Sequence, residues 1–197
     1  STGYTPKERE KLADVYMHLS KWPEARDKAA EVINAAKYSM VEVSTASDFS
    51  KIFGPDVVST AEEIFSLKYS RESNQGWWYV LFLHYPGDGY HGAGGYYGLY
   101  TDSVKNSFMA AWDGADLRRQ FDFYHYNIGL GTSTLLCRKF SDPSAPGQYG
   151  AANDYPLYRY PELLLMYAEA DNEANGSPTD QAMEYVNQVH RRAYGQP

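Results

Sequence analysis

Histidine, cysteine and aspartate are the first side chains to consider for metal chemistry. The chain has five histidines and one cysteine, Cys137, so it can form no internal disulfide. His84 and His91 lie seven residues apart in a glycine-rich stretch, with Asp88 between them. A zinc site needs three or four well-placed ligands. We therefore expect no metal site and no cofactor, and we interpret these histidines as solvated loop residues.

Paired carboxylates could hydrolyse a glycosidic bond if they stood about 5–9 Å apart across a sugar ring. The pairs available are Asp113 with Asp116, Glu169 with Asp171, and Glu62 with Glu63. Any acidic chain offers such pairs, and there is no Gly-x-Ser-x-Gly motif. The glycine-rich segment 92–95 lacks the Lys-Ser/Thr of a phosphate-binding loop. We predict that the protein is not an enzyme and has no catalytic residue.

Aromatic residues crowd the segment 77–100. Sugar rings present flat faces of weakly positive C–H groups, which stack on the weakly negative faces of aromatic rings. Glycines flank Tyr90, Tyr96 and Tyr97 and permit sharp turns, so we expect these three rings to be exposed. A core role stays open for the strand-like set Trp78, Val80 and Phe82. The predicted ligand-binding residues are Trp77, Trp78, Tyr85, Tyr90, Tyr96, Tyr97, Asn74 and Asp88.

Composition bounds the classes of function. The 197-residue chain has a net charge of −7, which disfavours nucleic acid as a partner because phosphate binding needs a basic face. No apolar run approaches the roughly 20 residues of a membrane span. The 19 tyrosines are unusual; each combines an apolar face with a polar hydroxyl, which suits wet binding surfaces.

Periodicity predicts the elements that must position these residues. Apolar residues recur at helical spacing near both ends of the chain and predict two helical hairpins, at 6–37 and 159–194. The expected helices are 6–20, 24–37, 160–175 and 178–194. In the first helix, the predicted apolar face consists of Leu12, Val15, Tyr16 and Leu19. The region 38–158 is rich in Gly, Pro, Ser and Asp and is expected to be loop-rich, with strands at 62–70 and 77–85 and a helix at 102–112.

Several segments together resemble the SusD/RagB family. The stretches "RYPELLLMYAEADNEANG" (159–176) and "AMEYVNQVHRRAYG" (182–195) are similar to the paired signature helices of that family. "AEVINAAKYSM" (30–40), "AEEIFSLKYS" (61–70) and "DLRRQFDFY" (116–124) match further family segments in the same order. The matches are spread over nearly the whole chain.

The resemblance implies a mostly α fold: tetratricopeptide-like helical hairpins carrying a loop-rich insertion with a few short strands, here one domain, 1–197. It also implies a non-catalytic lipoprotein of the cell outer membrane that binds oligosaccharides, or sometimes peptides, at the surface. Such a protein hands its ligand to a TonB-dependent SusC-like transporter. The anchor segment and both ends of a full-length member are expected to be missing, so membrane contact would come only through that lipid anchor. The alternative is a protein- or peptide-interaction scaffold built on the helices.

The residues that carry the resemblance are interpreted as structural. Glu162 and Glu169 are seven apart and share one helical face. Arg159 and Arg191 are the expected partners, because arginine makes bidentate contacts with carboxylates. Binding residues vary within the family, so the predicted site depends on the aromatic crowding alone.

Overall fold

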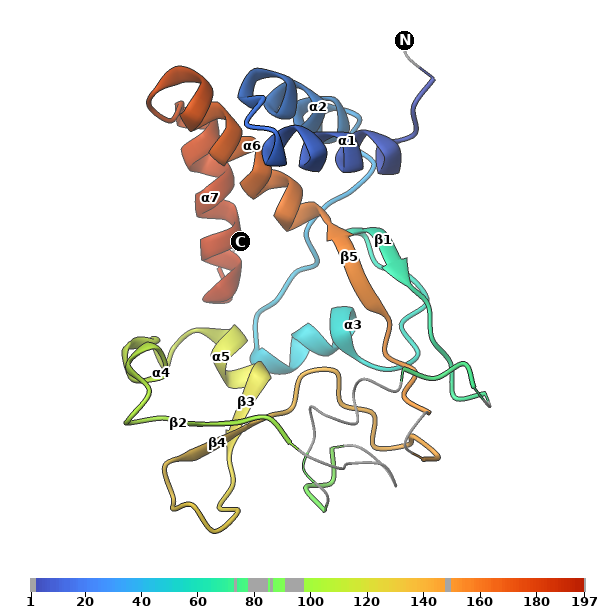
Figure 1. The fold of residues 1–197 in the computed structure, drawn as a ribbon, viewed down its shortest axis with the longest axis vertical. Helices are drawn as coiled ribbons and strands as arrows, with labels where there is room; N and C mark the ends of the chain where they lie inside the picture. Colours follow the sequence, from blue (N-terminus) through green and yellow to red (C-terminus); the bar gives the residue numbers. More distant parts are fainter. Residues whose placement is uncertain are drawn as a thin grey trace.

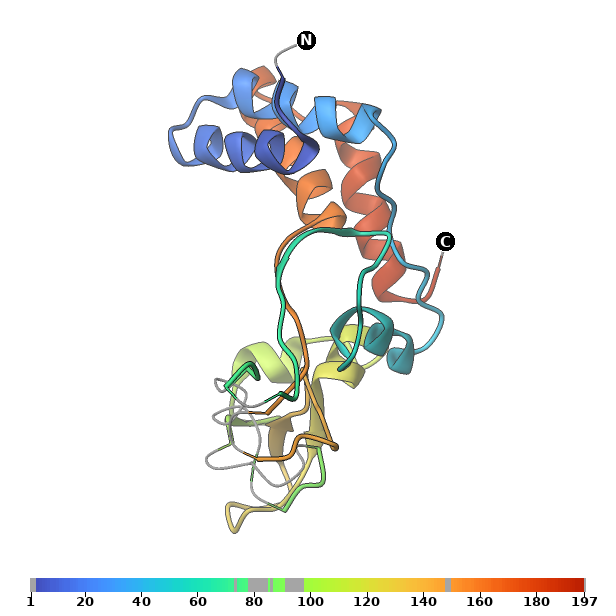
Figure 2. The same cartoon turned by 90° about the vertical axis from the view of Figure 1, so that its right-hand side faces the viewer.

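The computed structural model describes residues 3–72, 74–77, 85, 87–90, 98–147 and 150–196. The chain forms two parts that lie at opposite ends of an elongated molecule (Figure 1, Figure 2). The helical half contains α1, α2, α6 and α7, and therefore both termini. The loop-rich half contains the described residues of 43–56 and 68–154. Long extended segments connect the two halves, as Figure 2 shows.

The first hairpin consists of α1 (Pro6–His18) and α2 (Trp22–Asn34). A capping box starts α1, in which Glu8 N–H donates to the Thr5 hydroxyl while Thr5 N–H donates to the Glu8 carboxylate at 2.7 Å. Pro6 and Pro23 occupy the first turns, where their missing N–H costs nothing. Both helices begin close to the expected residues and end two or three residues early.

The predicted apolar face of α1 is wrong. Val15 and Leu19 are 49% and 58% exposed, while the buried residues of this helix are Glu10 and Ala13. Ala25 and Ala29 of α2 are also buried. Small side chains let the two helices approach closely, so the contact is made through alanines rather than through the larger apolar stripe.

The second hairpin consists of α6 (Tyr160–Asn175) and α7 (Asp180–Ala193). The limits predicted for α6 are confirmed, and Gly176 ends it with φ 73°, the left-handed conformation that glycine adopts without strain. Thr179 caps α7, and its hydroxyl accepts from Ala182 N–H at 3.2 Å. α2 packs against both α1 and α6, around a core that contains Ala13, Ala29, Val32, Ile64 and Leu163.

A two-stranded antiparallel ribbon leads from the helical half into the loop-rich half. β1 (Glu63–Leu67) pairs with β5 (Tyr155–Arg159), with Glu63 opposite Arg159. β1 lies inside the strand expected at 62–70. β5 continues directly into α6, so the ribbon extends the helical half (Figure 1).

A three-stranded antiparallel sheet lies in the loop-rich half. β4 (Thr134–Cys137) is its central strand, between β2 (Tyr100–Asp102) and β3 (Phe123–His125). Short helices surround it: η1 (Ala46–Phe49), α3 (Ser50–Phe53), α4 (Ser107–Ala111) and α5 (Leu117–Asp122). The single helix expected at 102–112 is wrong, because the Asp102 carboxylate accepts the N–H groups of Val104 and Lys105 and forms a turn before α4.

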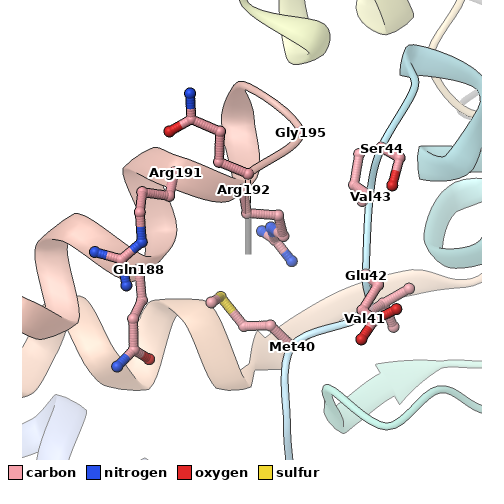
Figure 3. A pocket seen from close by; sticks show the side chains of 10 residues that line it. Met40, Val41, Glu42, Val43, Ser44, Gln188, Arg191, Arg192 and Gly195 are labelled. Atoms are coloured by element: carbon pink, nitrogen blue, oxygen red, sulfur yellow. The ribbon is translucent and has the colours of Figure 1, made fainter.

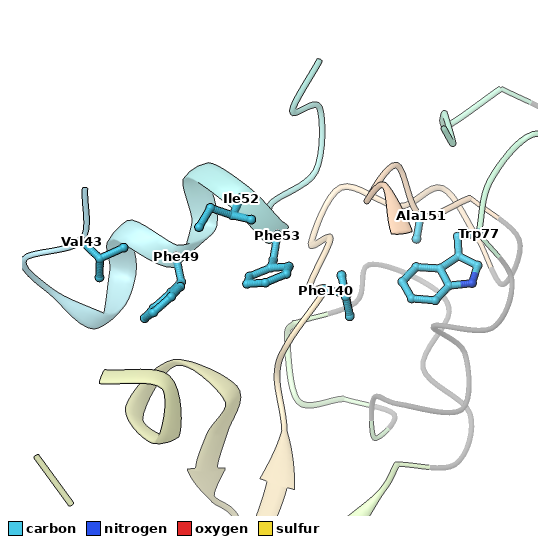
Figure 4. Packing of buried hydrophobic residues seen from close by; sticks show 7 residues of the cluster. All are labelled: Val43, Phe49, Ile52, Phe53, Trp77, Phe140 and Ala151. Atoms are coloured by element: carbon cyan, nitrogen blue, oxygen red, sulfur yellow. The ribbon is translucent and has the colours of Figure 1, made fainter. Parts of the chain in front are cut away.

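The core of the loop-rich half is aromatic. It contains Val43, Phe49, Ile52, Phe53, Trp77, Phe140 and Ala151 (Figure 4). Trp77 packs edge-on against Phe140, with ring centroids 4.9 Å apart, and stacks with Tyr69 at 5.8 Å. Of the strand expected at 77–85, only Trp77 and Tyr85 fall within the described residues.

A buried ion network connects the two halves. Glu62, at 0% exposure, accepts from Arg159 at 2.7 Å and from Arg192 of α7. Arg191 pairs with Glu184 at 2.7 Å. The expected attraction between Arg159 and Glu162 is present, since Arg159 opposes the burial that raises the pKa of Glu162. The ion pair of Arg159 is with Glu62, however, because the ribbon brings Glu62 beside it, and Arg191 pairs with Glu184 rather than with Glu169. Among the described helices, none is long and apolar enough to cross a membrane.

Candidate functional site

Tyr85 and the tight turn at residues 87–90 carry three of the predicted site residues. Gly87 and Gly89 adopt φ values of 84° and 82°, which are open to glycine and strained for other residues. Asp88 lies between them, and its carboxylate accepts Tyr90 N–H at 2.8 Å. The glycines therefore fold the turn so that Tyr85, Asp88 and Tyr90 lie on one small segment.

The three-stranded sheet presents tyrosines toward this turn. Tyr100 of β2 and Tyr124 of β3 are both register partners of Leu136 in β4. Residues directly opposite each other in paired strands project from the same face of a sheet, so Tyr100, Leu136 and Tyr124 share one face. Tyr126 follows two residues after Tyr124 and continues that face.

Ring contacts seat the turn on this face. Tyr90 meets Tyr124 edge-on with centroids 4.8 Å apart, and Tyr85 contacts Tyr126 at 5.8 Å. Tyr124 and Tyr126 are 6.0 Å apart. We call Tyr85, Tyr90, Tyr124 and Tyr126 the tyrosine cluster. Gly98 is required beside it, because a Cβ there would stand 2.9 Å from the Cβ of Tyr85.

Asp88 fixes the electrostatics of the tyrosine cluster. The Tyr124 hydroxyl donates to the Asp88 carboxylate at 2.8 Å. Burial and this hydrogen bond hold the pKa of Tyr124 well above its ordinary value, so the phenol stays neutral and keeps donating. Asp88 therefore connects the turn to the sheet through Tyr124. It also stabilises the turn internally through the Tyr90 backbone.

Arg138 adds a cation at the edge of the tyrosine cluster. Its Nε donates to the Phe121 carbonyl at 2.9 Å, another guanidinium nitrogen donates to the Gln120 carbonyl, and Nη1 approaches the Tyr90 hydroxyl at 3.5 Å. The guanidinium lies 5.9 Å from the Tyr90 ring centroid, within cation–π range. Arg138 thus holds the end of α5 and orients the ring of Tyr90.

Exposure decides which rings a ligand can reach. Tyr100 is 61% exposed and Tyr126 is 37% exposed, whereas Tyr85, Tyr90 and Tyr124 are half-buried. An accessible tyrosine offers both a ring face and a hydroxyl. The arrangement can therefore stack on a flat, C–H-rich surface and exchange hydrogen bonds at its rim.

The structure separates the predicted site residues. Tyr85, Asp88 and Tyr90 come together, although Tyr90 is half-buried rather than exposed as expected. Trp77 is a core residue at 7% exposure, so its ring faces are covered by protein. Asn74 is exposed at a turn with φ 63°, and no described hydrogen bond or ring contact joins it to the tyrosine cluster. Trp78, Tyr96 and Tyr97 lie outside the described residues.

Sequence reasoning missed Tyr124, Tyr126, Arg138 and Tyr100. A signal for the first pair was present, because "FYHY" at 123–126 alternates with the period of a strand. What the sequence lacked was the pairing of β3 and β2 with β4, which brings residues 24 positions apart, Tyr100 and Tyr124, onto one face.

Two of the carboxylates considered for catalysis are engaged in structural ion pairs and hydrogen bonds. Asp116 is 2% exposed, bonds Arg118 at 2.6 Å and accepts the Trp112 indole N–H at 2.9 Å. Glu62 is held by two arginines. Burial raises the pKa of the Cys137 thiol to about 11, which keeps it protonated and poorly nucleophilic. Among the residues that the structure describes, no three His, Cys, Asp or Glu side chains form a metal-binding group.

A separate hollow of about 560 Å³ lies between α7 and the extended segment 40–44 (Figure 3). Gln188, Arg191 and Arg192 line its helical side. Both arginines are engaged in ion pairs, with Glu184 and Glu62. The hollow lacks the exposed rings found near the tyrosine cluster, so it is a weaker match to a glycan.

Comparison with known proteins finds a family model that matches part of the sequence and solved structures with a similar fold. Residues 124–196 match the model of the SusD family. The fold is similar to that of a SusD superfamily protein from Parabacteroides distasonis, at a TM-score of 0.72 and 20% identity over 96% of this chain and 44% of that one. Surface glycan-binding protein A from Bacteroides uniformis gives a TM-score of 0.71 at 19% identity, over 96% and 42%.

A SusD homolog from Bacteroides thetaiotaomicron is also similar, at a TM-score of 0.70 and 18% identity, over 98% of this chain and 45% of that one. The chain therefore spans less than half the length of these solved structures. No curated protein matches it. The shared fold is mostly helical, with a few short strands, as the sequence predicted.

Proposed function

Because this chain is SusD-like, with a SusD-family match over residues 124–196 and the SusD-superfamily fold, we propose that it binds glycans at the cell surface without catalysing a reaction. Structural neighbours from Bacteroides fluxus, Bacteroides thetaiotaomicron and Bacteroides uniformis are named surface glycan-binding proteins. The observation that carries the proposal is the tyrosine cluster seated on one sheet face, with Tyr100 and Tyr126 open to solvent.

The binding mode follows from the geometry. The faces of Tyr100 and Tyr126 stack on the C–H faces of sugar rings. Half-buried Tyr85, Tyr90 and Tyr124 brace Tyr126 and supply hydroxyls, while Asp88 holds the turn in place. Few contacts and an open surface mean weak affinity, which suits a protein that must release its ligand. Trp78, Tyr96 and Tyr97 stay part of the proposed site from the sequence, as do Asn74 and Asp88.

Release completes the proposed role. The protein would sit at the outer membrane through a lipid anchor and pass oligosaccharides to a TonB-dependent SusC-like transporter. These elements come from the family resemblance, and the transporter contact is tested by mixing purified full-length protein with its purified transporter. Co-elution on size exclusion is expected. Separate elution in detergent at micromolar concentrations of both would contradict the hand-over.

The glycan proposal is tested by a glycan array, followed by calorimetry with the best binder. Tyr100→Ala and Tyr126→Ala should each weaken binding by about 1–2 kcal/mol, roughly 5–30-fold in Kd, because each removes one stacking face. The matched control is Tyr4→Ala, a tyrosine 52% exposed in the helical half, which should bind as the unmodified protein does. If Tyr100→Ala and Tyr126→Ala both bind the glycan as tightly as the unmodified protein, the glycan site does not lie at the tyrosine cluster and Tyr100.

The alternative function, a protein- or peptide-interaction scaffold, has its own supporting observation. Apolar side chains stay exposed on or beside three helices: Val15 of α1 and its C-cap residue Leu19, Leu165 of α6, and Met183 and Val186 of α7. Exposed apolar patches mark interaction sites. A peptide that binds the chain and is lost in Leu19→Asp but kept in Tyr126→Ala would favour the scaffold over the glycan site.

A further inference from the structure

Four of the family-like segments meet at one place in the fold. Glu62 comes from the segment 61–70, Asp116 and Arg118 from 116–124, Arg159 from 159–176 and Arg192 from 182–195. Arg159 and Arg192 both bond Glu62, and Arg118 bonds Asp116 at 2.6 Å. The proposed glycan site makes no use of this cluster, which lies where the two halves join.

Positive charge exceeds negative charge at this junction. Four cationic side chains line one small cavity: Arg118, Lys139, Arg159 and Arg192. The described carboxylates that they contact within 4.0 Å are three, namely Glu62, Asp116 and Asp122. Glu162, near Arg159, and Arg138, near Asp122, add one charge of each sign, so five positive charges minus four negative charges leave a surplus of one.

The longest of these ion pairs indicates which side chain carries the surplus positive charge. Lys139 approaches Asp122 only to 3.8 Å, beyond hydrogen-bond distance. Its ammonium instead lies 4.3 Å from the ring centroid of Phe53, a neutral partner. Burial raises the pKa of Asp122, and the charge of Lys139 opposes that shift.

The guanidinium groups are also crowded. Burial lowers the pKa of Arg192; Glu62 opposes this shift, and the nearby charges of Arg159 and Arg118 add to it. Arg159 lies 5.0 Å from the same Phe53 ring that Lys139 covers. Like charges packed around one ring in a partly buried site repel one another, and an anion among them would relieve that repulsion.

The cavity has the size for a small ion. Its volume is about 70 Å³, and Phe49, Phe53, Phe121 and Asp122 complete its lining. One water needs roughly 10–15 Å³ of such space, so an ion with a few waters fits. A sugar ring or a nucleotide does not.

We propose that the cavity bounded by Arg118, Lys139, Arg159 and Arg192 binds one halide-sized monovalent anion, such as chloride, which braces the junction between the helical and loop-rich halves. The three phenylalanines exclude bulk water from one side, and the ammonium of Lys139 supplies the charge that Asp122 leaves unbalanced.

Thermal unfolding at pH 7 and constant ionic strength tests the proposal, with sodium chloride compared against sodium gluconate, whose anion is too large for the cavity. The unmodified protein should unfold about 2–4 °C higher in saturating chloride. Lys139→Gln should abolish that difference. The matched control is Lys105→Gln, because Lys105 also lies 3.8 Å from an aspartate but is exposed, and it should keep the full chloride effect.

A direct readout does not depend on any variant folding. Crystals of the unmodified protein grown with sodium bromide should give an anomalous peak among Arg118, Lys139 and Arg192. Equal unfolding temperatures in chloride and gluconate would overturn the proposal. So would a chloride effect that survives in Lys139→Gln, or bromide peaks found only elsewhere on the surface.

Discussion

Two buried glutamates show how differently the two regions of this molecule handle charge. Glu10, inside the helical half, and Glu62, at the junction, are each 0% exposed. Glu62 accepts from two arginines, whereas neither carboxylate oxygen of Glu10 has a hydrogen-bond partner among the described residues. The junction pairs its carboxylate with two cations. The helical half keeps its carboxylate neutral by surrounding it with apolar groups and with the acidic residues Asp14 and Glu162.

The difference shows which contacts determine the conformation of each half. The helical half packs through alanines, aliphatic side chains and tyrosines, and its buried Asp171 accepts from Asn175 and from Thr179 N–H. The loop-rich half has little regular structure, so polar contacts set its shape: Arg71 with Asp142, Arg118 with Asp116, and Tyr124 with Asp88. A loss of one charge should therefore be costly at the junction and harmless, or even favourable, at Glu10.

The largest expected effect comes from Glu62→Ala. The substitution leaves Arg159 and Arg192 without their carboxylate at a buried site, which should lower the free energy of unfolding by about 3–5 kcal/mol. Urea denaturation measures it. Glu63→Ala is the matched neighbour, since Glu63 pairs with the half-exposed Lys68 and should cost about 1 kcal/mol or less. Similar losses of unfolding free energy in both variants would show that the ion pairs of Glu62 stabilise the protein no more than an exposed pair does.

A smaller effect of opposite sign is expected from Glu10→Gln. Burial, then the charges of Glu162 and Asp14, raise the pKa of Glu10 from 4.5 to about 8. Between these values the folded state binds a proton that the unfolded state has lost, so stability falls as pH rises from about 4.5 to about 8. Glu10→Gln should remove this fall and gain about 2–4 kcal/mol at pH 8 relative to the unmodified chain.

The control for this pH dependence is Glu8→Gln on the same helix. Hydrogen bonds from Thr5 lower the pKa of Glu8, so its contribution is present at neutral pH and is lost as pH falls through that lowered pKa. Denaturation curves from pH 4 to pH 9 separate the two. A pH profile left unchanged by Glu10→Gln would mean that Glu10 is ionised and solvated in the folded protein.

The smallest effect is expected from Tyr124→Phe, which sharpens the comparison within the loop-rich half. It deletes one hydrogen bond to the Asp88 carboxylate and should cost about 1–2 kcal/mol. Amide exchange should rise in the turn at 87–90 and stay unchanged in α6. Tyr126→Phe is the control, because no described hydrogen bond uses its hydroxyl. Equal exchange in both variants would show that Asp88 does not anchor the turn.

How far the fold was predictable depends on how local its causes are. The 3.6-residue period and the glycine after Asn175 placed α6 correctly, because helix signals lie within the segment itself. The same period predicted the wrong buried face for α1. A periodic pattern does not show which face of a helix packs against the alanines of the neighbouring helix. The helix expected at 102–112 failed because Asp102 and Asn106 form local turns and caps that competed with it.

The candidate site was predictable only in part, for a related reason. Glycines around Asp88 indicated a turn that carries Tyr85 and Tyr90, and φ values at Gly87 and Gly89 agree. Trp77 looked the same as its aromatic neighbours in sequence, and only its contacts with Tyr69 and Phe140 distinguish it as core. Tyr124 and Tyr126 joined the site through strand pairing, which no single-sequence pattern specifies.

By itself, the sequence determined the helical hairpins at both ends, the loop-rich character between them and the resemblance to the SusD/RagB family, because periodicity, turn residues and motifs are written in adjacent positions. Tertiary structure alone decided which aromatics are reachable, which carboxylates are paired and where four separate segments converge on Glu62 and Asp116. Burial and ion pairing depend on residues far apart in the sequence; Glu62 and Arg192, for example, are 130 positions apart.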